Sequence, residues 1–541
     1  MNDAALRRRL HQVYALLDSG DFARAVPAAE QLIQVAPGFA PGWSALSEVW
    51  LGAAEPARAA DCAERALEIE PGSVDRRVHA ARCRLAADAT EAARNHAEAA
   101  CRQLDGIEVT RSSSQPAAQT LDTLATVLGR LGEPRPALAL YRRAADAAPD
   151  NADILFNLAT SLRNTNAIDQ AERLFERVLA LRPDDPETLQ SLVLMRRQTE
   201  SDNRIPQIER ALGRPHPWPE QARLHYSLGK SLEDLERYSE AFDAYRKGAV
   251  LVDGKVPEAA KRDTESLRAA ESALPDLLRA DTADDASTGP PQVFIVGLPR
   301  SGSTLLERML GAHPGLRAGG ELGAFADAIR AASGIKDRLE LLQRLASRAA
   351  TVDSAQLRRE YLARIGALGL KPRGLIDKMP SNLYWVPLIH RALPEARILL
   401  TRRDPMDNGL ALFTTLFVTG HFQTFDLDRT GRHLSAFERL AHAFDQGLPT
   451  NRFRIVDYED LVAEPERCLR DLTAFCGLAW DPACLRFHES RDTVQTASAH
   501  QVREPVHRRS VGRWRHYAEQ LEPLRIALGS SLRTTLPSSG G

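Results

Sequence analysis

The sequence predicts two kinds of structure in one chain: an all-α superhelix of stacked helical repeats, followed by an α/β domain with a central parallel sheet. Three observations predict this fold class. A 34-residue spacing recurs in the first half, a small, acidic and Pro/Gly-rich stretch ends it near residue 290, and short β-rich apolar runs alternate with helical segments beyond it. With 541 residues, 43% hydrophobic and 26% charged, the composition is that of a globular protein with room for two to four domains.

The helical repeats are marked by prolines at a fixed interval. They form two pairs, each 34 residues apart: Pro37 with Pro71, and Pro149 with Pro183. Each follows an amphipathic segment such as "NAIDQAERLFERVLALRP", and a further copy starts near Leu224. A 34-residue period with a proline after the second helix resembles the tetratricopeptide repeat, in which neighbouring helix pairs stack into a superhelix with a concave groove. The alternative is a plain helical bundle with accidental spacing. Around residues 105–120 the repeats degenerate, and we expect a long loop or a break there.

The domain boundaries follow from these patterns. We predict a repeat domain over residues 1–255, a helical and acidic linker over 256–290, and an α/β domain over 291–535. Four apolar runs in the last part read as strands, at residues 293–297, 374–378, 396–402 and 452–459. Strand–helix alternation favours a parallel sheet covered by helices.

Charge and cysteine content exclude several classes of protein. The net charge is −2, from 70 basic and 72 acidic residues, which argues against a general nucleic-acid or membrane-surface binder. The six cysteines are scattered and form no CxxC pair, so we expect reduced thiols. The first residues lack the apolar core of a signal peptide, and no run approaches the roughly 20 apolar residues of a membrane span. We therefore expect a cytoplasmic protein, and a homodimer stays open.

A loop after the first predicted strand has the form of a phosphate cradle. In "VFIVGLPRSGSTLLERMLGAHP" Gly297 and Gly302 have the spacing of GxxxxGK[ST], but Ser303 replaces the lysine. A strand before the loop and a helix after it make an anion site, because backbone N–H groups at a helix N-terminus face the loop. Arg300 supplies a positive charge inside the loop, and the missing lysine disfavours a nucleoside triphosphate. The alternative is a plain strand–helix turn.

Two further basic segments accompany this loop. Arg402 and Arg403 stand just past the run 396–402, where ligands of open α/β sheets bind. The segment 501–517, "QVREPVHRRSVGRWRHY", holds five arginines and two histidines. Each alone is usually a solvated turn or face. Three basic elements around one sheet indicate a ligand with phosphates at two separate positions.

These motifs together resemble the sulfotransferase superfamily, which uses 3′-phosphoadenosine 5′-phosphosulfate (PAPS). The match runs over roughly residues 290–530 and rests on motifs in order: "PRSGSTLLERMLGAHP", "GGE", "DKMPSN", "RRDPMD", "DYEDLV" and "SAHQVREPV…SVGRW". It is similar above all to tyrosylprotein sulfotransferases and to their bacterial relatives fused to tetratricopeptide repeats. The resemblance implies a P-loop-type α/β fold.

The resemblance also implies roles for named residues. The 5′-phosphosulfate loop corresponds to Arg300, Ser301, Gly302, Ser303 and Thr304. Arg403 corresponds to the arginine that grips the 3′-phosphate, Tyr458 to a tyrosine near the nucleotide, and Arg513 to a basic residue at the same site. The family's serine and arginine at the 3′-phosphate are replaced by Ala411 and Thr415. Each lost hydrogen bond to a charged group is worth roughly 1.5–3 kcal/mol, so these changes predict weaker PAPS binding.

For catalysis the resemblance implies Glu321 as the base and places Lys378 and Ser498 near the transferring sulfuryl group. Sulfuryl transfer needs alignment and charge stabilisation, as phosphoryl transfer does, and Arg300 with Lys378 can neutralise the charge that develops on the leaving group. No metal is required by this scheme. Without the family pattern, Glu321 is equally an exposed acid after a turn, Lys378 a strand end, and Ser498 a turn residue. His313 is expected to be structural.

The sequence is compatible with three kinds of acceptor or role. The leading prediction is a hydroxyl of a protein or peptide tyrosine, presented by the repeats, because a carboxylate base suits a phenol and an extended groove suits an extended ligand. One alternative is a carbohydrate or small-molecule sulfotransferase. The other is a non-catalytic repeat scaffold with a degenerate nucleotide domain, which the replacements Ala411 and Thr415 favour slightly.

Overall fold

The computed structural model describes residues 3–104, 115–278, 291–489 and 504–529. The chain divides into two compact units, Met1–Pro183 and Asp184–Gly541. Each unit is described by itself.

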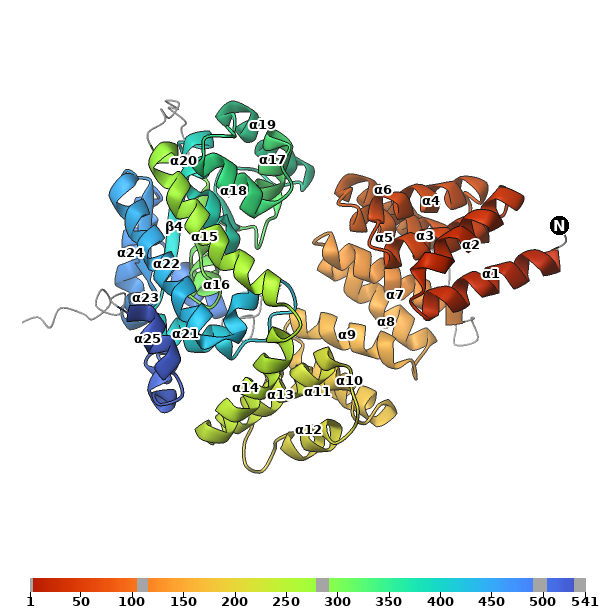
Figure 1. The fold of residues 1–541 in the computed structure, drawn as a ribbon, viewed down its shortest axis with the longest axis horizontal. Coiled ribbons are helices and arrows are strands. Elements are labelled where there is room, and N and C mark those ends of the chain that lie inside the picture. Colours follow the sequence, from red (N-terminus) through yellow and green to blue (C-terminus); the bar gives the residue numbers. More distant parts are fainter. Residues whose placement is uncertain (1–2, 105–114, 279–290, 490–503, 530–541) are drawn as a thin grey trace, which may run out of the picture. The chain divides into compact units, whose positions relative to one another are not determined.

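The first unit consists of consecutive helix pairs (Figure 1). Within its described part, ten helices form five pairs: α1 (Asp3–Asp18) with α2 (Phe22–Val35), α3 (Ala40–Gly52) with α4 (Pro56–Ile69), α5 (Val74–Ala86) with α6 (Thr90–Leu104), α7 (Gln115–Arg130) with α8 (Pro134–Ala147), and α9 (Ala152–Asn164) with α10 (Ile168–Leu181). Each of the four repeat prolines follows two residues after the last residue of a second helix. The predicted repeat superhelix is therefore confirmed. Of the expected break at 105–120, residues 105–114 lie outside the described part, and residues 115–120 belong to α7, so the expected loop is wrong there.

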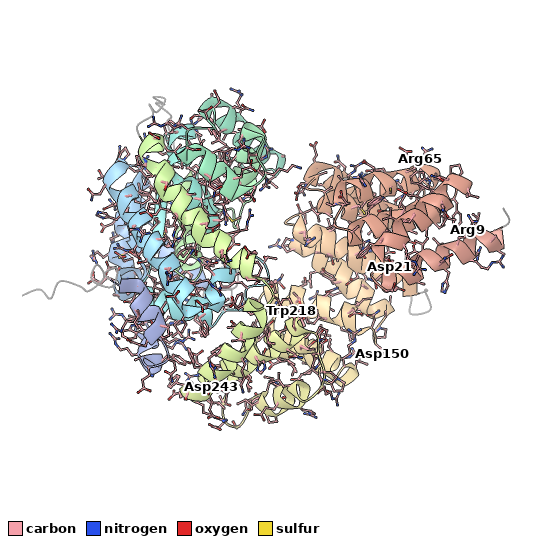
Figure 2. All side chains as sticks on the ribbon, in the orientation of Figure 1. Arg9, Asp21, Arg65, Asp150, Trp218 and Asp243 are labelled. Atoms are coloured by element: carbon pink, nitrogen blue, oxygen red, sulfur yellow. The ribbon has the colours of Figure 1, made fainter. Side chains whose placement is uncertain are left out.

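Small buried side chains let these helices approach one another. Alanines with no exposed surface recur along both helices of a pair, among them Ala25, Ala29, Ala45, Ala59 and Ala63. Charged side chains stand on the outer faces, as Figure 2 shows for Arg9, Asp21, Arg65 and Asp150. An apolar stripe on one face with charges on the other is what makes each helix pair dependent on its neighbours.

The second unit begins with further helices: α11 (Pro186–Met195), α12 (Ile205–Leu212), α13 (Trp218–Asp234), α14 (Tyr238–Asp253) and α15 (Pro257–Leu278). In the α13–α14 hairpin, Gly229 lies against the Tyr245 ring and Gly248 against the Tyr226 ring, where a Cβ atom would come within 2.8 Å of the ring. The boundary between compact units follows packing and lies after Pro183, whereas the predicted boundaries at 255 and 290 follow the repeat pattern and stay predictions.

A five-stranded parallel sheet forms the centre of the second unit. Its strands are β1 (Val293–Gly297), β2 (Arg317–Ala318), β3 (Leu375–Lys378), β4 (Arg397–Arg402) and β5 (Phe453–Asp457), in the order β2-β3-β1-β4-β5. The α/β prediction is confirmed, with the four predicted runs forming β1, β3, β4 and β5. The two-residue strand β2 was not predicted.

Both faces of the sheet are covered. Along β1, Phe294 and Val296 enter one apolar cluster, while Val293 and Ile295 enter the other. The first cluster includes side chains of α13–α15, α17 (Ala324–Ser333), α18 (Arg338–Ala346), α19 (Ser354–Ala367), η1 (Pro380–Trp385), α20 (Val386–Ala392), α21 (Pro405–Phe413), η2 (Phe422–Phe425), α22 (Leu427–Gly447), η5 (Arg513–Tyr517) and α25 (Glu522–Leu528). The second includes side chains of α16 (Ser303–Gly311), α23 (Tyr458–Ala463), α24 (Pro465–Phe475) and η3 (Pro482–Glu489). Burial on both faces explains why the strands read as continuous apolar runs.

All six cysteines lie in described segments, and all are free, so the prediction of unpaired thiols is confirmed. None of the helices within the described ranges combines the length and apolar character that a membrane span requires.

Candidate active site

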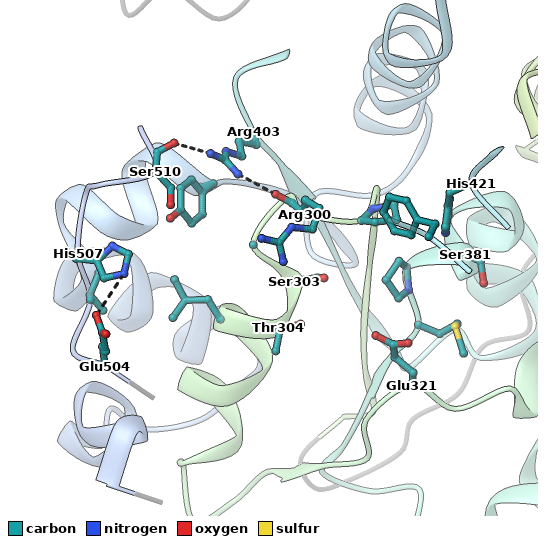
Figure 3. A pocket seen from close by; sticks show the side chains of 18 of the residues that line it. Arg300, Ser303, Thr304, Glu321, Ser381, Arg403, His421, Glu504, His507 and Ser510 are labelled. Carbon is teal, nitrogen blue, oxygen red and sulfur yellow. Dashed lines mark hydrogen bonds and ion pairs between the residues drawn. The ribbon is translucent and has the colours of Figure 1, made fainter. Parts of the chain in front are cut away.

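A cavity of about 330 Å³ lies at the carboxyl ends of β1, β3, β4 and β5. Parallel strands present their ligand sites at this edge. Segments that follow all five strands contribute to its wall, including the turn after β2 that carries Glu321, together with the segment Glu504–Ser510 and part of the loop after α21 (Figure 3). Seven predicted site residues line it: Arg300, Gly302, Ser303, Thr304, Glu321, Arg403 and Tyr458.

The loop after β1 has the backbone of an anion cradle. Arg300 and Gly302 both take positive φ, at 65° and 99°, and Ser303 opens α16. A Cβ atom at Gly302 would lie 2.6 Å from the Tyr458 ring, so only glycine lets the tyrosine pack against this turn. Ser301 faces inward instead: its hydroxyl donates to the Leu298 carbonyl at 2.7 Å and does not line the cavity.

The guanidinium groups of Arg300 in this loop and of Arg403, which follows β4, repel one another. Burial, followed by repulsion from Arg403, lowers the pKa of Arg300 to about 10. Arg300 therefore stays charged at neutral pH, and the concentration of positive charge favours an anion in the cavity.

Arg403 is held at one end of the cavity by backbone oxygens. Its Nη1 donates to the Arg300 carbonyl at 3.1 Å, its Nη2 donates to the Ser510 carbonyl, and its guanidinium carbon lies 5.0 Å from the centre of the Tyr458 ring (Figure 3). Among the described residues its buried Nε has no hydrogen-bond partner. By contrast, Arg402 is bound to both carboxylate oxygens of Asp457, at 2.6 and 3.0 Å, and takes no part in the site.

Glu321 and Lys378 form an ion pair beside the loop. Lys378 is the last residue of β3 and is fully buried, and its Nζ lies 2.6 Å from Glu321 Oε1 and 3.8 Å from Glu307 Oε2. Glu307 in turn accepts the Gly320 N–H at 2.8 Å, which fixes the turn that carries Glu321. The Glu321 side chain is 42% exposed and lines the cavity, whereas Lys378 lies behind it. The pair thus presents a carboxylate to the cavity with an ammonium group at its back.

A buried acid precedes the lysine on β3. Asp377 is fully buried, and the Tyr361 hydroxyl donates to it at 3.0 Å. Burial raises the pKa of Asp377 to about 8, so this carboxyl is predominantly protonated at neutral pH. The β3 end therefore carries one buried cation, Lys378, beside a neutral acid.

The cavity near Glu321 has a wall that the sequence did not predict. Met379, Pro380 and Phe417 supply apolar surface, and Ser381 and His421 supply polar groups. Gly420 and His421 both take positive φ, and the His421 ring centre lies 5.1 Å from that of Phe417. In the sequence this loop is marked by Gly420, a glycine after a helix. Such a glycine indicates a helix end and does not identify a functional site.

Besides Ser301, three predicted residues do not line the cavity or cannot be placed. Arg513 donates to Glu233 of α13, and Ser498 lies outside the described residues. Lys378 lies behind Glu321 and contacts its carboxylate. Neither Ala411 nor Thr415 lines the cavity, and the Thr415 hydroxyl donates to the Ala411 carbonyl at 2.7 Å.

The prediction that the arginines of 501–517 form an anion-binding stripe is wrong in part. Within its described portion, Arg508 donates to the Ala463 carbonyl, Arg509 pairs with Glu504, and Arg513 pairs with Glu233. These arginines are engaged with the protein itself, because each finds a carboxylate or carbonyl within reach. His313 is structural as predicted: its Nδ1 accepts the Gly315 N–H at 2.9 Å, which leaves its Nε2 to donate to the Ala479 carbonyl at 2.8 Å.

Comparison with known proteins connects this site with a family. Residues 291–482 match the model of the sulfotransferase family. Residues 10–74, 130–193 and 205–260 match models of the tetratricopeptide repeat. Both resemblances seen in the sequence are confirmed.

The relatives are distant. An uncharacterized protein of Aquifex aeolicus (strain VF5) is 26% identical over 402 residues, covering 71% of this chain and 51% of that protein. Protein-tyrosine sulfotransferase 2 of Gallus gallus is 29% identical over 238 residues, covering 41% of this chain and 63% of that protein. The chain thus spans about half to two thirds of the length of these relatives. Among solved structures, the sulfotransferase domain from the Synechococcus PCC 7002 olefin synthase is 22% identical, covering 48% of this chain and all of that one with a TM-score of 0.33.

Proposed function

This chain carries a sulfotransferase-family domain together with tetratricopeptide repeats, and from that premise we propose that it moves a sulfuryl group from PAPS to a protein or peptide tyrosine. The observation that carries the proposal is the joining of two groups of residues in one cavity. One is the lysine-free phosphate loop with Arg403, and the other is Glu321 backed by Lys378.

The residues present fit a nucleotide with two anionic ends. Arg300, Ser303 and Thr304 surround the N-terminus of α16, which suits a 5′-phosphosulfate. Arg403 would hold the 3′-phosphate, and its buried, unpartnered Nε is a donor that such an anion would satisfy. Tyr458 packs on Gly302 and under the Arg403 guanidinium, and it would hold the phosphate loop and Arg403 in position.

The chain's own residues supply the rest of the reaction. PAPS, when bound, supplies an activated sulfuryl group joined to its 5′-phosphate. Glu321 accepts the proton of the attacking hydroxyl, a contribution of about 10²–10⁴ in rate for a positioned base. Arg300 and the N–H groups of the loop neutralise charge at the leaving phosphate, and Lys378 holds the Glu321 carboxylate in place.

A phenol fits the acceptor end better than an alkyl alcohol or a sugar does. A phenol has a pKa near 10, so a carboxylate base can accept its proton. An alkyl alcohol is a much weaker acid and holds its proton more tightly. Met379, Pro380 and Phe417 line the same cavity as Glu321 and offer apolar surface for an aromatic ring. The name of the Gallus gallus relative, a protein-tyrosine sulfotransferase, points to the same acceptor. We propose the repeats as the surface that presents the protein.

The test is a transfer assay with sulfur-labelled PAPS and three acceptors: a tyrosine peptide, the same peptide with serine in place of tyrosine, and an oligosaccharide. Label on the tyrosine peptide alone supports the proposal. Label on the oligosaccharide alone contradicts the tyrosine acceptor and supports a carbohydrate sulfotransferase. No transfer to any acceptor, with PAPS intact, contradicts an enzyme of this kind and favours a scaffold.

A further inference from the structure

Glu233 is a buried carboxylate that the reaction above does not use. It lies in the last turn of α13, inside the repeat segment 205–260, and its side chain is 11% exposed. Four donors surround it. Arg513 contributes Nε and Nη2, each at 2.6 Å, and the hydroxyls of Tyr517 and Tyr245 lie at 3.0 and 3.1 Å. A carboxylate satisfied this completely fixes its partners, since removing it would leave buried donors unpaired.

The partner of Glu233 belongs to a segment that walls the cavity. We call residues 504–517 the C-terminal strap. Its first half lines the cavity through Glu504, Pro505, Val506, His507 and Ser510. Its second half is tied down by Asp407 of α21, which accepts the N–H groups of Gly512 and Trp514 at 2.5 and 2.9 Å, and by Glu233 at Arg513.

The strap also sets the position of Arg403. The Ser510 carbonyl accepts from Arg403 Nη2, opposite the Arg300 carbonyl that accepts from Nη1 (Figure 3). A shift of Ser510 would therefore turn the guanidinium that faces the phosphate end. Only two residues separate Ser510 from Arg513, so the Glu233–Arg513 pair acts close to this contact.

The α13–α14 hairpin packs on the strap and on α21. The rings of Tyr238 and His516 are stacked with centres 4.3 Å apart, and those of Phe242 and Phe413 with centres 5.4 Å apart. The Tyr226 hydroxyl donates to the Phe413 carbonyl at 3.1 Å. The hairpin thus packs directly against α21, the helix that begins just after Arg403, and both belong to the same compact unit.

We infer that Glu233 is a positioning residue of the nucleotide site, so that this helical repeat forms part of the machinery that binds the 3′-phosphate. Glu233 fixes Arg513, Arg513 holds the strap, and the strap orients Arg403. The inference rests on the proposed function, since the anion that Arg403 would bind is the 3′-phosphate of PAPS.

The experiment compares the full chain with its Glu233→Gln variant by calorimetry. The probes are 3′,5′-adenosine bisphosphate and 5′-AMP, which differ only in the 3′-phosphate. We expect the Kd for the bisphosphate to rise at least fivefold and the Kd for 5′-AMP to change less than twofold. An unchanged bisphosphate Kd, or equal losses for both nucleotides, overturns the inference.

Two further variants separate positioning from folding. Glu236→Gln is the matched control, because Glu236 lies three residues further on and pairs on the surface with Arg197, with a side chain 68% exposed; it should leave both affinities unchanged. Tyr517→Phe removes a single donor to Glu233 and should raise the bisphosphate Kd less than Glu233→Gln does. If Glu233→Gln fails to fold, Tyr517→Phe decides: an unchanged selectivity for the bisphosphate overturns the inference. An unaltered chain that binds neither nucleotide overturns the proposed function and this inference together.

Discussion

Glu321 and Lys378 are the two residues on which the proposed chemistry depends most closely. Replacing Glu321 with Gln removes the base but keeps an oxygen that can accept from Lys378 Nζ, so the buried ammonium is not left without a partner. We expect turnover of the best acceptor to fall by about 10²–10⁴, the usual contribution of general base catalysis, while bisphosphate affinity stays within threefold. Steady-state rates and calorimetry on the same preparation check both parts. Equal loss of binding and turnover would contradict the role of Glu321 as a base.

Asp377 gives the site a dependence of stability on pH. Burial raises its pKa to about 8 in the folded chain, while an unfolded Asp titrates near 3.9. Between these pH values the folded chain holds a proton on Asp377 that the unfolded chain has lost. The contribution of this proton to the free energy of unfolding is therefore complete below pH 4 and disappears as pH rises through 8. Asp377→Asn lacks this titration.

We therefore expect the free energy of unfolding of Asp377→Asn to rise relative to the unaltered chain as pH increases from 5 to 8, by at most about 1.4 kcal/mol per pH unit. Denaturant titrations at four pH values measure the difference. A constant difference over this window would show that Asp377 is ionised in the folded chain.

The loop residues and Arg403 could be predicted because they stand directly after strands, where local pattern and position in the sheet coincide. Glu321 was predicted only through the family resemblance. The sequence did not predict Glu233 or His421. Glu233 lies 280 residues from Arg513, and no local periodicity encodes that contact. The same limit applies to the arginines of 501–517, whose charge is visible in the sequence but whose carboxylate and carbonyl partners are not.

At the scale of the element, the turn between β1 and α16 depends on Gly302. Its φ of 99° is unfavourable for any residue with a Cβ atom, and an added Cβ would overlap the Tyr458 ring at 2.6 Å. We expect Gly302→Ala to cost about 1–3 kcal/mol of stability and to weaken bisphosphate binding at least tenfold, because Tyr458 must move. The control is Gly366→Ala, where nothing lies within 4 Å of the added atom. Thermal unfolding and calorimetry measure both effects, and binding unchanged in Gly302→Ala would contradict this account of the loop.

The strands were predictable at this scale for a physical reason. β1 and the centre of β4 are buried on both faces and therefore consist largely of apolar residues, which stand out between helices. β2 has only two residues, one of them exposed, and makes its backbone pairs with β3 without an apolar pattern. Pairing of this kind arises from the neighbouring strand and leaves no signal in the segment itself.

At the scale of the whole molecule, compactness and repeat pattern divide the chain at different places. The helices from Pro186 to Leu278 belong to the same unit as the sheet, because side chains such as Tyr245, Leu267 and Leu274 enter the cluster that covers it. The 34-residue pattern continues through α13 and α14, so the sequence alone assigns them to the repeats.

A shortened chain tests this division. We expect a chain that starts at Asp184 to fold and to keep its bisphosphate Kd within threefold, since it retains a complete compact unit. A chain that starts at residue 256 should fail to fold, because it leaves the apolar surface under α13 and α14 uncovered. Thermal unfolding and calorimetry distinguish the two. A stable, binding-competent chain from residue 256 would contradict the assignment of the hairpin to the sheet unit.

The central claim is that the cavity is built for a nucleotide with a 3′-phosphate and a 5′-phosphosulfate. Its most direct test is calorimetric binding of 3′,5′-adenosine bisphosphate to the full chain, with ATP and the variant Arg403→Ala as controls. The account predicts micromolar binding of the bisphosphate, no measurable binding of ATP, and at least a tenfold loss in Arg403→Ala, in keeping with a lost hydrogen bond to a charged group. Binding of ATP as tight as that of the bisphosphate, or binding of neither, would contradict it.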